Sequence, residues 1–344
     1  MAEHVTILGD GAMATVCALL LAQGGHSVTL WGAFEESIDR IRQTRENQLL
    51  PGVKIPLGVT ATANESDCFV GSTLIVSAIP TQFLRTIWTR LRPSVPANIP
   101  VVSVSKGIEN NTLLRPTQVI GDCLGPYLAR TIAVLSGPNI AGELARYLPA
   151  TAVVASEDAE LAARVQSVFS TQWFRVYTNF DVIGTELAGA TKNVIAIAAG
   201  ILDGLAAGDN AKAALVTRGL VEITRLGVAM GARHETFQGL AGLGDLITTC
   251  VSPLGRNRSV GEQIGRGQKL EDILGQLKSV AEGVPTTKSL YELSRRFNVE
   301  MPITQAVHSV LFERKDVLHA LSDLMSRDPK AEHWTKTGHR TDAP

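Results

Sequence analysis

Residues 5–14, VTILGDGAMA, restrict the fold of this 344-residue chain more than any other segment. The first four form a short apolar run typical of a buried strand in a parallel sheet. An apolar run over residues 16–22 then predicts a helix, and residues 27–31 predict a second strand. Between the first strand and the helix stands the spacing G-x-G-x-x-A, at Gly9, Gly11 and Ala14. This is the strand–turn–helix–strand context that a dinucleotide-binding unit needs.

Each small residue of this fingerprint has a physical role. Gly9 permits the tight turn, Gly11 lets the backbone approach a pyrophosphate, and Ala14 keeps the helix close to the sheet. The N-terminus of the helix then presents its N–H groups to the phosphates. The alternative is a glycine-rich turn without a ligand. The surrounding strand and helix patterns favour the dinucleotide site.

The first half of the chain repeats this alternation of strand and helix. Further apolar runs predict buried strands at residues 74–78, 101–104, 132–135 and 152–155. Helical patterns or Pro and Gly residues separate them, which is typical of a doubly wound α/β sheet. From about Gly184 the strand signals stop, and helical patterns follow at residues 184–206, 211–230, 258–266, 270–276, 282–297 and 303–312.

We therefore predict two domains, which the length of the chain also favours. A Rossmann-type, dinucleotide-binding α/β domain spans residues 1–183, and an all-helical domain for catalysis and substrate binding spans residues 184–326. A polar tail over residues 327–344 is expected to fray.

Composition limits the partners and the compartment. A net charge of −1 gives no reason to expect a nucleic acid or an anionic membrane as partner. Glu3 and Asp10 interrupt the N-terminus, so no signal peptide is expected, and the apolar runs are shorter than the roughly 20 residues that span a bilayer. The histidines lack metal-ligand spacing, so no metal is expected. Widely separated cysteines predict free thiols in a reducing cytosol: Cys17, Cys68, Cys123 and Cys250.

One lysine, Lys192, stands inside an otherwise apolar or small-residue segment, residues 186–200. If this segment is a helix, it is apolar nearly all round and therefore buried. Burial lowers the pKa of an ammonium group, which can then exchange a proton near neutral pH. The alternative is a structural lysine whose ammonium snorkels or caps. A dinucleotide site in the same chain favours the functional interpretation.

Two loops of the predicted sheet contain groups suited to anions. Lys106 follows the strand predicted at residues 101–104, and open α/β sheets bind ligands at the carboxyl ends of their strands. A solvated loop lysine is the alternative there. The loop SGPNIAGE, residues 136–143, leads into a helix, so its N–H groups either hold an anion or only form a turn.

Two segments of the predicted helical domain also carry charge. Asp245 follows two glycines in the apolar stretch AGLGDLITTC, where an acid is either a helix cap or the partner of a buried cation. In the string GRNR, Arg256 and Arg258 flank Asn257, and arginine forks suit phosphate oxygens. Two solvated surface arginines are the alternative.

Together these segments resemble one family. The following strings occur in this order: GDGAMA, VSKGIE, SGPNIAGEL, ELAGATKNVIAIAAG, NAKAALVTRGL, GLAGLGDLITTC, GRNR, EGVPTTK and MPIT. From residue 5 to about residue 315 the sequence resembles NAD(P)-dependent glycerol-3-phosphate dehydrogenase of the bacterial type. The resemblance implies that a cytoplasmic homodimer interconverts dihydroxyacetone phosphate and sn-glycerol 3-phosphate with NAD or NADP. The product would supply glycerophospholipid synthesis.

The resemblance also implies roles for individual residues. Lys192 would be the catalytic proton donor and acceptor, and Lys106 would contact both cofactor and substrate. The substrate would also meet Gly137, Asn139, Asp245, Gly255, Arg256 and Asn257. The cofactor would lie against Gly9, Gly11, Ala12, Met13, Ala14, Ala33, Lys106, Ala141, Arg256, Val280 and Glu282.

Four positions depart from the family pattern. Met13 replaces a usual aromatic residue, and Ala33 replaces a frequent arginine. Asn139 replaces a usual serine or threonine, and Gly255 replaces a usual hydroxyl residue. Because none of them is the proton-transfer lysine, these changes bear on cofactor affinity and preference rather than on the reaction type.

The choice between NAD and NADP stays open at this point. A ribose-binding acid is expected about 20 residues after the glycines, and the chain reads LWGAFEE there. Ala33 offers neither a carboxylate nor a guanidinium, and Glu35 and Glu36 come slightly late.

Two other functions remain open from the sequence. One is a sister dehydrogenase of the same layout that acts on a 2-hydroxyacid or a ketopantoate-like substrate. The arginine–asparagine cluster argues against it because this cluster suits a phosphate. The other is a regulator that binds the dinucleotide without turnover. The intact Lys192 argues against that function.

Overall fold

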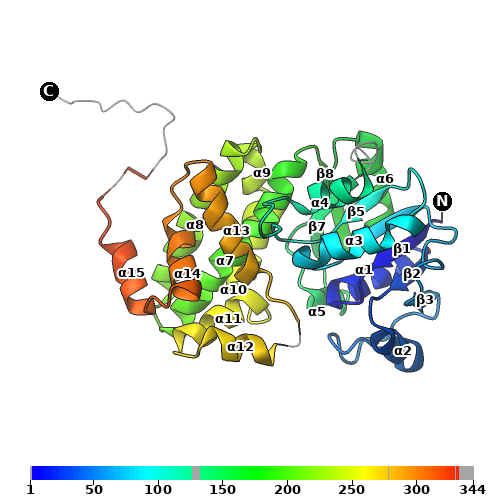
Figure 1. Cartoon of the computed structure of the whole chain (residues 1–344), viewed down its shortest axis with the longest axis horizontal. Coiled ribbons are helices and arrows are strands. Elements are labelled where there is room, and N and C mark those ends of the chain that lie inside the picture. Colours follow the sequence, from blue (N-terminus) through cyan, green and yellow to red (C-terminus); the bar gives the residue numbers. More distant parts are fainter. Residues whose placement is uncertain (1, 126–131, 278, 330, 333–344) are drawn as a thin grey trace.

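The structure is a computed structural model that describes residues 2–125, 132–277, 279–329 and 331–332. Its N-terminal part is a sheet flanked by helices, and its C-terminal part is a group of packed helices beside that sheet (Figure 1). The expected fraying of residues 327–344 falls mostly outside the described residues.

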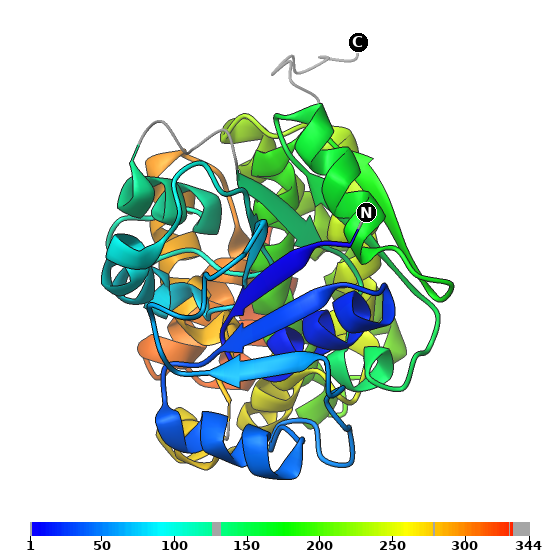
Figure 2. The same cartoon turned by 90° about the vertical axis from the view of Figure 1, so that its right-hand side faces the viewer.

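Eight strands form one sheet in the order β3-β2-β1-β4-β5-β6-β7-β8. The strands are β1 His4–Leu8, β2 Ser27–Trp31, β3 Val59–Thr62, β4 Leu74–Ser77, β5 Val101–Ser103, β6 Ile132–Ser136, β7 Ala150–Ala155 and β8 Phe174–Asn179. All neighbours pair in parallel except β6 and β7. Figure 2 shows the blue and light-blue strands β1, β2 and β3 side by side. The order reverses at β1, between β2 and β4, which is the switch point where such sheets bind ligands.

The two edge strands are the ones that the sequence did not indicate. β3 is only four residues long and reads VTAT, so it lacks a strong apolar run. β8 alternates buried and exposed side chains, with Phe174 and Val176 inside and Arg175 and Tyr177 outside. An edge strand with one solvated face alternates in this way, whereas the sequence search followed continuous apolar runs.

Helices cover both faces of the sheet. They are α1 Ala12–Gln23, α2 Glu35–Thr44, η1 Thr81–Phe83, α3 Leu84–Leu91, η2 Arg92–Ser94, α4 Pro116–Leu124, α5 Ala141–Leu144 and α6 Ala159–Phe169. Side chains alternate along β1, so Ile7 packs in one core with α1, and its neighbour Leu8 packs in another core with Trp88 of α3. The fingerprint turn leaves β1 between these two cores.

The C-terminal part is built around α7, Val182–Gly204. Around it lie α8 Asp209–Ala229, α9 His234–Gln238, the π-helix η4 Leu240–Gly244, α10 Asp245–Val251, α11 Arg256–Gly265, α12 Leu270–Gln276, α13 Gly283–Arg296, α14 Pro302–Phe312 and α15 Val317–Met325. The predicted helices agree with these bounds to within two residues. The sequence search did not predict α9, η4, α10 or α15, all of which are short.

The helix α7 also corrects one expectation. It is long and apolar enough to cross a membrane by length and composition, although no apolar run of that length was expected. In the structure, 89% of its most apolar window is buried inside the protein. All residues from Gly184 to Leu202 are buried, so α7 is the central helix of the second part.

Glycines bring α11 into backbone contact with α7. A Cβ atom at Gly200 would lie 1.9 Å from the carbonyl oxygen of Arg258, and one at Gly261 would lie 2.0 Å from that of Ile197. Only glycine permits such an approach. An ion pair between Arg258 and Asp203, with Nη2 2.6 Å from Oδ2, joins the same two helices. The first turn of α11 is thereby held beside the segment that contains Lys192.

Candidate active site

Two lysines from different parts of the fold share one carboxylate. Lys192 lies in the middle of α7, and its Nζ is 3.1 Å from Oδ1 of Asp245. Lys106 lies in the loop after β5, and its Nζ is 2.6 Å from Oδ2 of the same residue. Asp245, the first residue of α10, is 2% exposed. Of the two interpretations of Asp245, the structure supports the partner of a buried cation.

The surroundings of Lys192 change its acidity. Burial is the main cause that lowers the pKa of Lys192 to about 8, and the positive charge of Lys106 acts in the same direction. The carboxylate of Asp245 opposes both. The ammonium also donates a hydrogen bond to Oγ1 of Thr249. A group with a pKa near 8 can give and take a proton close to physiological pH.

The loop after β6 completes the surroundings of Lys106. The carbonyl oxygen of Gly137 accepts a hydrogen bond from Nζ of Lys106 at 3.0 Å. Gly137 has a φ of +142°, and a Cβ atom there would lie 3.0 Å from the carbonyl oxygen of Thr151, so the position requires glycine. The amide of Asn139 donates to that same carbonyl of β7 at 3.1 Å. Gly137 therefore lies at the lysine pair, whereas the amide N–H of Asn139 is bonded to the sheet.

The start of α11 provides a cluster suited to an anion. Gly255 is the N-cap residue, and no side chain caps this end within the described residues. The exposed Arg256 donates from Nη1 to the carbonyl oxygen of Val280 at 3.0 Å. The buried Asn257 accepts the N–H of Gly283 on Oδ1 at 3.0 Å. Free N–H groups and a guanidinium at one helix end can hold a phosphate.

Glu282 connects the two parts of the chain. Its Oε1 accepts the N–H of Thr81, the first residue of η1, at 2.8 Å. Its Oε2 is buried without a hydrogen-bond partner in the described part of the chain. Burial raises the pKa of Glu282 to about 7. A buried carboxylate oxygen without a partner fits a ligand that donates an N–H group, such as an amide.

The fingerprint turn has the shape that a pyrophosphate needs. Gly9 has a φ of +118°, and a Cβ atom there would lie 2.8 Å from the carbonyl oxygen of Ala78. A Cβ atom at Gly11, the N-cap residue of α1, would meet open space. Ala12 and Met13 form the first turn, Ala14 is fully buried, and Ala141 packs against the same core from α5. These residues fit a dinucleotide over the N-terminus of α1.

Several residues that support the site by hydrogen bonds were not predicted from the sequence. The buried Asn47 donates from Nδ2 to the carbonyl oxygen of Asp10 at 2.6 Å and to Oγ1 of Thr15 at 2.8 Å, which ties the fingerprint turn to α1. Asn193 donates to the carbonyl oxygen of Lys106 at 3.3 Å. The sequence positions of Thr249 and Asn193 could have indicated a role at the site, because Thr249 lies four residues after Asp245 and Asn193 follows Lys192. The position of Asn47 gave no such indication, since it lies in an irregular loop.

The end of β2 bears on the choice of cofactor. Ala33 follows this strand, and Glu35 and Glu36 lie in the first turn of α2. The guanidinium of Arg42 is paired with Glu35 and with Asp39, at 2.8 Å each. Of the two arginines on α2 that could bind a 2′-phosphate, Arg42 is therefore engaged with two carboxylates, and Arg40 donates to Oε1 of Gln48 at 2.9 Å.

We expect the enzyme to use NADH at least as well as NADPH, because the carboxylates near Ala33 repel a 2′-phosphate. Ala33→Arg should raise kcat/KM for NADPH relative to NADH. The corresponding change in free energy is that of one ion pair at a partly exposed site, ~1 kcal/mol. Titration of both cofactors against wild type and variant measures this. A wild type that prefers NADPH by about tenfold, ~1.4 kcal/mol, would show that another cation grips the phosphate.

A buried lysine with a lowered pKa shares a carboxylate with Lys106, which follows strand β5 of a dinucleotide fold, and this arrangement is typical of a dinucleotide-dependent dehydrogenase. The comparisons with known proteins specify which one. The family model for the N-terminus of NAD-dependent glycerol-3-phosphate dehydrogenase matches residues 4–162, and the model for its C-terminus matches residues 181–322. The chain belongs to this family, as its sequence resemblance implied.

Individual relatives agree with this assignment. Glycerol-3-phosphate dehydrogenase [NAD(P)+] of Geobacter sulfurreducens is 48% identical over 335 residues, which cover 97% of this chain and 100% of the relative. A second enzyme of that name, from Salinibacter ruber, is 48% identical over 341 residues and is covered to 99%. The crystal structure of glycerol-3-phosphate dehydrogenase from Coxiella burnetii matches with a TM-score of 0.90 at 35% identity, covering 95% of this chain and 99% of that one. The predicted fold class and the nicotinamide dinucleotide cofactor are thereby confirmed.

Proposed function

We propose that the chain reduces dihydroxyacetone phosphate to sn-glycerol 3-phosphate, and catalyses the reverse reaction, at the site around Lys192. The observation that carries this proposal is the buried carboxylate of Asp245 between the ammonium groups of Lys192 and Lys106. The bound dinucleotide would supply the hydride to C2 of the substrate. The side chains of this chain would handle the charge and the proton.

Lys192 would donate its proton to the C2 oxygen as negative charge develops there. Lys106 would stabilise the same charge electrostatically. Asp245 would keep the ammonium of Lys192 charged and aimed, because its carboxylate favours the protonated form. In the reverse direction the neutral amine of Lys192 would accept the proton from the C2 hydroxyl.

The substrate phosphate would bind at the start of α11. Arg256 supplies a guanidinium fork, and Asn257 lies beside it on the first turn. The sister dehydrogenase for a 2-hydroxyacid or a ketopantoate-like substrate has no use for this cluster. Oxidation of NADH with dihydroxyacetone phosphate, ketopantoate and 2-keto acids side by side distinguishes them. Equal rates with the unphosphorylated substrates would overturn the proposal, and binding of NADH without turnover of any substrate would favour the regulator.

We expect Arg256→Lys to raise KM for dihydroxyacetone phosphate although the charge is kept, because lysine cannot offer a bidentate fork. The expected loss of substrate-binding free energy is that of one charge-assisted hydrogen bond, about 1.5–3 kcal/mol. Steady-state kinetics at saturating cofactor measure it. Arg266→Lys is the matched control, since Arg266 is exposed and paired with Glu262 on the far end of α11. Unchanged constants in Arg256→Lys would make Arg256 an ordinary surface arginine.

The remaining site residues would serve the cofactor. Gly9, Gly11 and Ala14 would shape the pyrophosphate site, and other parts of the cofactor would lie against Ala12, Met13, Ala33, Ala141, Val280 and Glu282. Glu282 would accept an N–H group of the nicotinamide carboxamide on its free Oε2. The chain would consist of a dinucleotide-binding domain over residues 1–183, a helical catalytic domain over residues 184–326 and a polar tail over residues 327–344.

The enzyme would be a cytoplasmic homodimer whose product supplies glycerophospholipid synthesis, as in the resemblance given above. Light scattering on the purified full-length chain tests the assembly. A mass twice the 36.7 kDa of one chain supports the dimer, and a mass of one chain contradicts it.

A further inference from the structure

The loop between β5 and α4 carries Lys106 and lies between the two parts of the chain. We propose that Glu109 is a positioning residue for Lys106, which acts through the ion pair between Glu109 and Arg85 of α3. This inference rests on the role proposed above for Lys106. In the described part of the chain no hydrogen bond or ion pair joins Glu109 to Lys106 or Lys192, so its effect would be exerted through the backbone of the loop.

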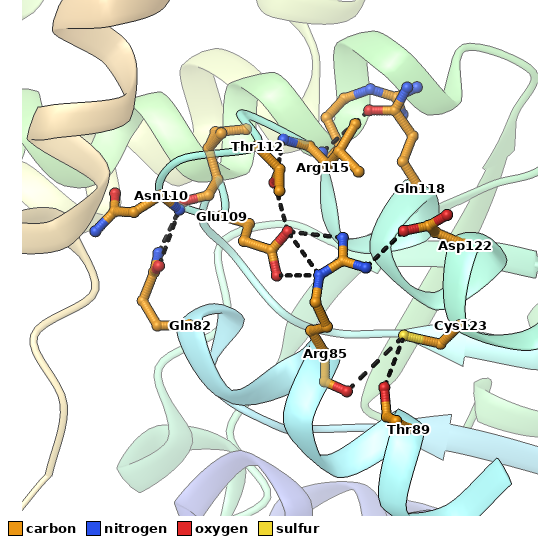
Figure 3. A network of polar contacts seen from close by, with 12 residues as sticks. Gln82, Arg85, Thr89, Glu109, Asn110, Thr112, Arg115, Gln118, Asp122 and Cys123 are labelled. Atoms are coloured by element: carbon orange, nitrogen blue, oxygen red, sulfur yellow. Dashed lines mark hydrogen bonds and ion pairs between the residues drawn. The ribbon is translucent and has the colours of Figure 1, made fainter.

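Glu109 is held by a bidentate pair at the centre of a polar network (Figure 3). Nε of Arg85 lies 3.0 Å from Oε1 of Glu109, and Nη2 lies 2.9 Å from Oε2. The hydroxyl of Thr112 donates to the same carboxylate. The side chain of Glu109 is only 9% exposed. Such a fork fixes both the distance and the direction of the loop relative to α3.

The side chain of Gln82 in η1 forms hydrogen bonds with two backbone atoms of the same loop. Its Nε2 donates to the carbonyl oxygen of Ile108 at 2.8 Å, and its Oε1 accepts the N–H of Asn110 at 3.0 Å. From the helical part, Oγ of Ser289 donates to the side chain of Asn110 at 2.6 Å. The segment on both sides of Glu109 is therefore tied to two different parts of the fold.

The chain between Glu109 and Lys106 has little room to move. A Cβ atom at Gly107 would lie 2.6 Å from Oγ1 of Thr81 and 2.9 Å from Oε2 of Glu282. The fully buried side chain of Ile108 packs in the core of the helical part. A shift of the loop at Glu109 is thus transmitted along three residues to Lys106. Misplacement of a catalytic group by about 1 Å can cost about a hundredfold in rate.

The same guanidinium provides a matched control. Nη1 of Arg85 lies 2.5 Å from Oδ2 of Asp122 on α4, and the Asp122 side chain is 58% exposed. Within the described residues Asp122 forms an ion pair with the arginine and no hydrogen bond or ion pair with the loop. Loss of the exposed partner should therefore leave Lys106 in place, whereas loss of the buried partner should not.

The experiment is a double-mutant cycle in kcat/KM for dihydroxyacetone phosphate. We expect Glu109→Gln to lower kcat/KM by about tenfold or more, the scale of a misplaced catalytic group. Arg85→Lys, which keeps the charge and loses the fork, should lower it in the same sense, and Asp122→Asn should stay within about twofold of wild type. In a Lys106→Ala background, Glu109→Gln should have no further effect, because the group that it positions is gone.

Each outcome decides one question. A Lys106→Ala variant with wild-type kinetics overturns the proposed role of Lys106 and leaves nothing to position. If Lys106→Ala is impaired but Glu109→Gln is not, or if the two losses multiply, the positioning role is wrong. If Glu109→Gln does not fold, the cycle is run with Arg85→Lys instead. If the losses of kcat/KM in Arg85→Lys and Lys106→Ala then multiply in the double variant, the inference is equally overturned.

Discussion

Lys192→Ala is expected to lower kcat by roughly two to four powers of ten, the usual scale for the loss of a general acid. Among the described residues the other ammonium at this carboxylate is that of Lys106, which approaches Asp245 from its other oxygen and so does not occupy the place of Lys192. Binding of NADH should persist, since the fingerprint turn lies on β1 and α1 rather than on α7. Single-turnover rates and fluorescence titration with NADH measure the two effects separately.

Lys269→Ala is the matched control for this prediction, because Lys269 is an exposed lysine that precedes α12. It should keep wild-type turnover. A Lys192→Ala variant that retains more than about a tenth of wild-type turnover, a loss smaller than general-acid catalysis supplies, would contradict the assignment. A variant that loses NADH binding as well would point to a general failure of folding.

Asp245→Asn is expected to lower kcat by about two powers of ten, the lower end of the range for losing an acid–base group. The substitution keeps the shape of the side chain but leaves two ammonium groups close together without their shared carboxylate. Removing one partner of a buried ion pair is strongly destabilising. Thermal unfolding therefore accompanies the kinetics, and the kinetic loss is to be measured well below the unfolding temperature.

The pH profile separates the role of Asp245 from a simple loss of stability. In the proposed mechanism reduction requires the protonated form of Lys192, so we expect its rate to fall as the pH rises through a pKa of about 8. The carboxylate of Asp245 raises the pKa of Lys192, so Asp245→Asn lowers that pKa. The descending limb for reduction should therefore move to lower pH. A limb that stays in place would show that another group titrates there.

The sequence was sufficient for the parts of the fold where one physical requirement dominates. A helix that is apolar all round must be buried, and this predicted α7 and the burial of Lys192. The fingerprint predicted the turn after β1 because Gly9 needs a positive φ. Asp245 was the opposite case. Its two interpretations differ only in which side chains surround it, and the nearest ones lie 53 and 139 residues away in the chain.

The contacts that support the site could not be predicted for the same reason. Asn47, Gln82 and Ser289 are ordinary polar residues, and their positions become informative only when the fold brings distant segments together. The edge strand β8 escaped because one of its faces is solvated. The residues assigned from the family pattern, from Ala12 to Glu282, stay predictions.

If the proposed site is correct, the backbone contact between α7 and α11 has a consequence for the length of the substrate. Gly200 and Gly261 let the main chains of two helices come into direct contact. One helix carries Lys192, the proposed proton donor, and the other carries the proposed phosphate site. The distance between the phosphorus and the reacting carbon of the substrate would therefore depend on the positions of main-chain atoms in these two helices. Homologous substrates with one more or one fewer carbon between these groups would not fit both ends at once, and exchange of surface side chains would not alter that selectivity.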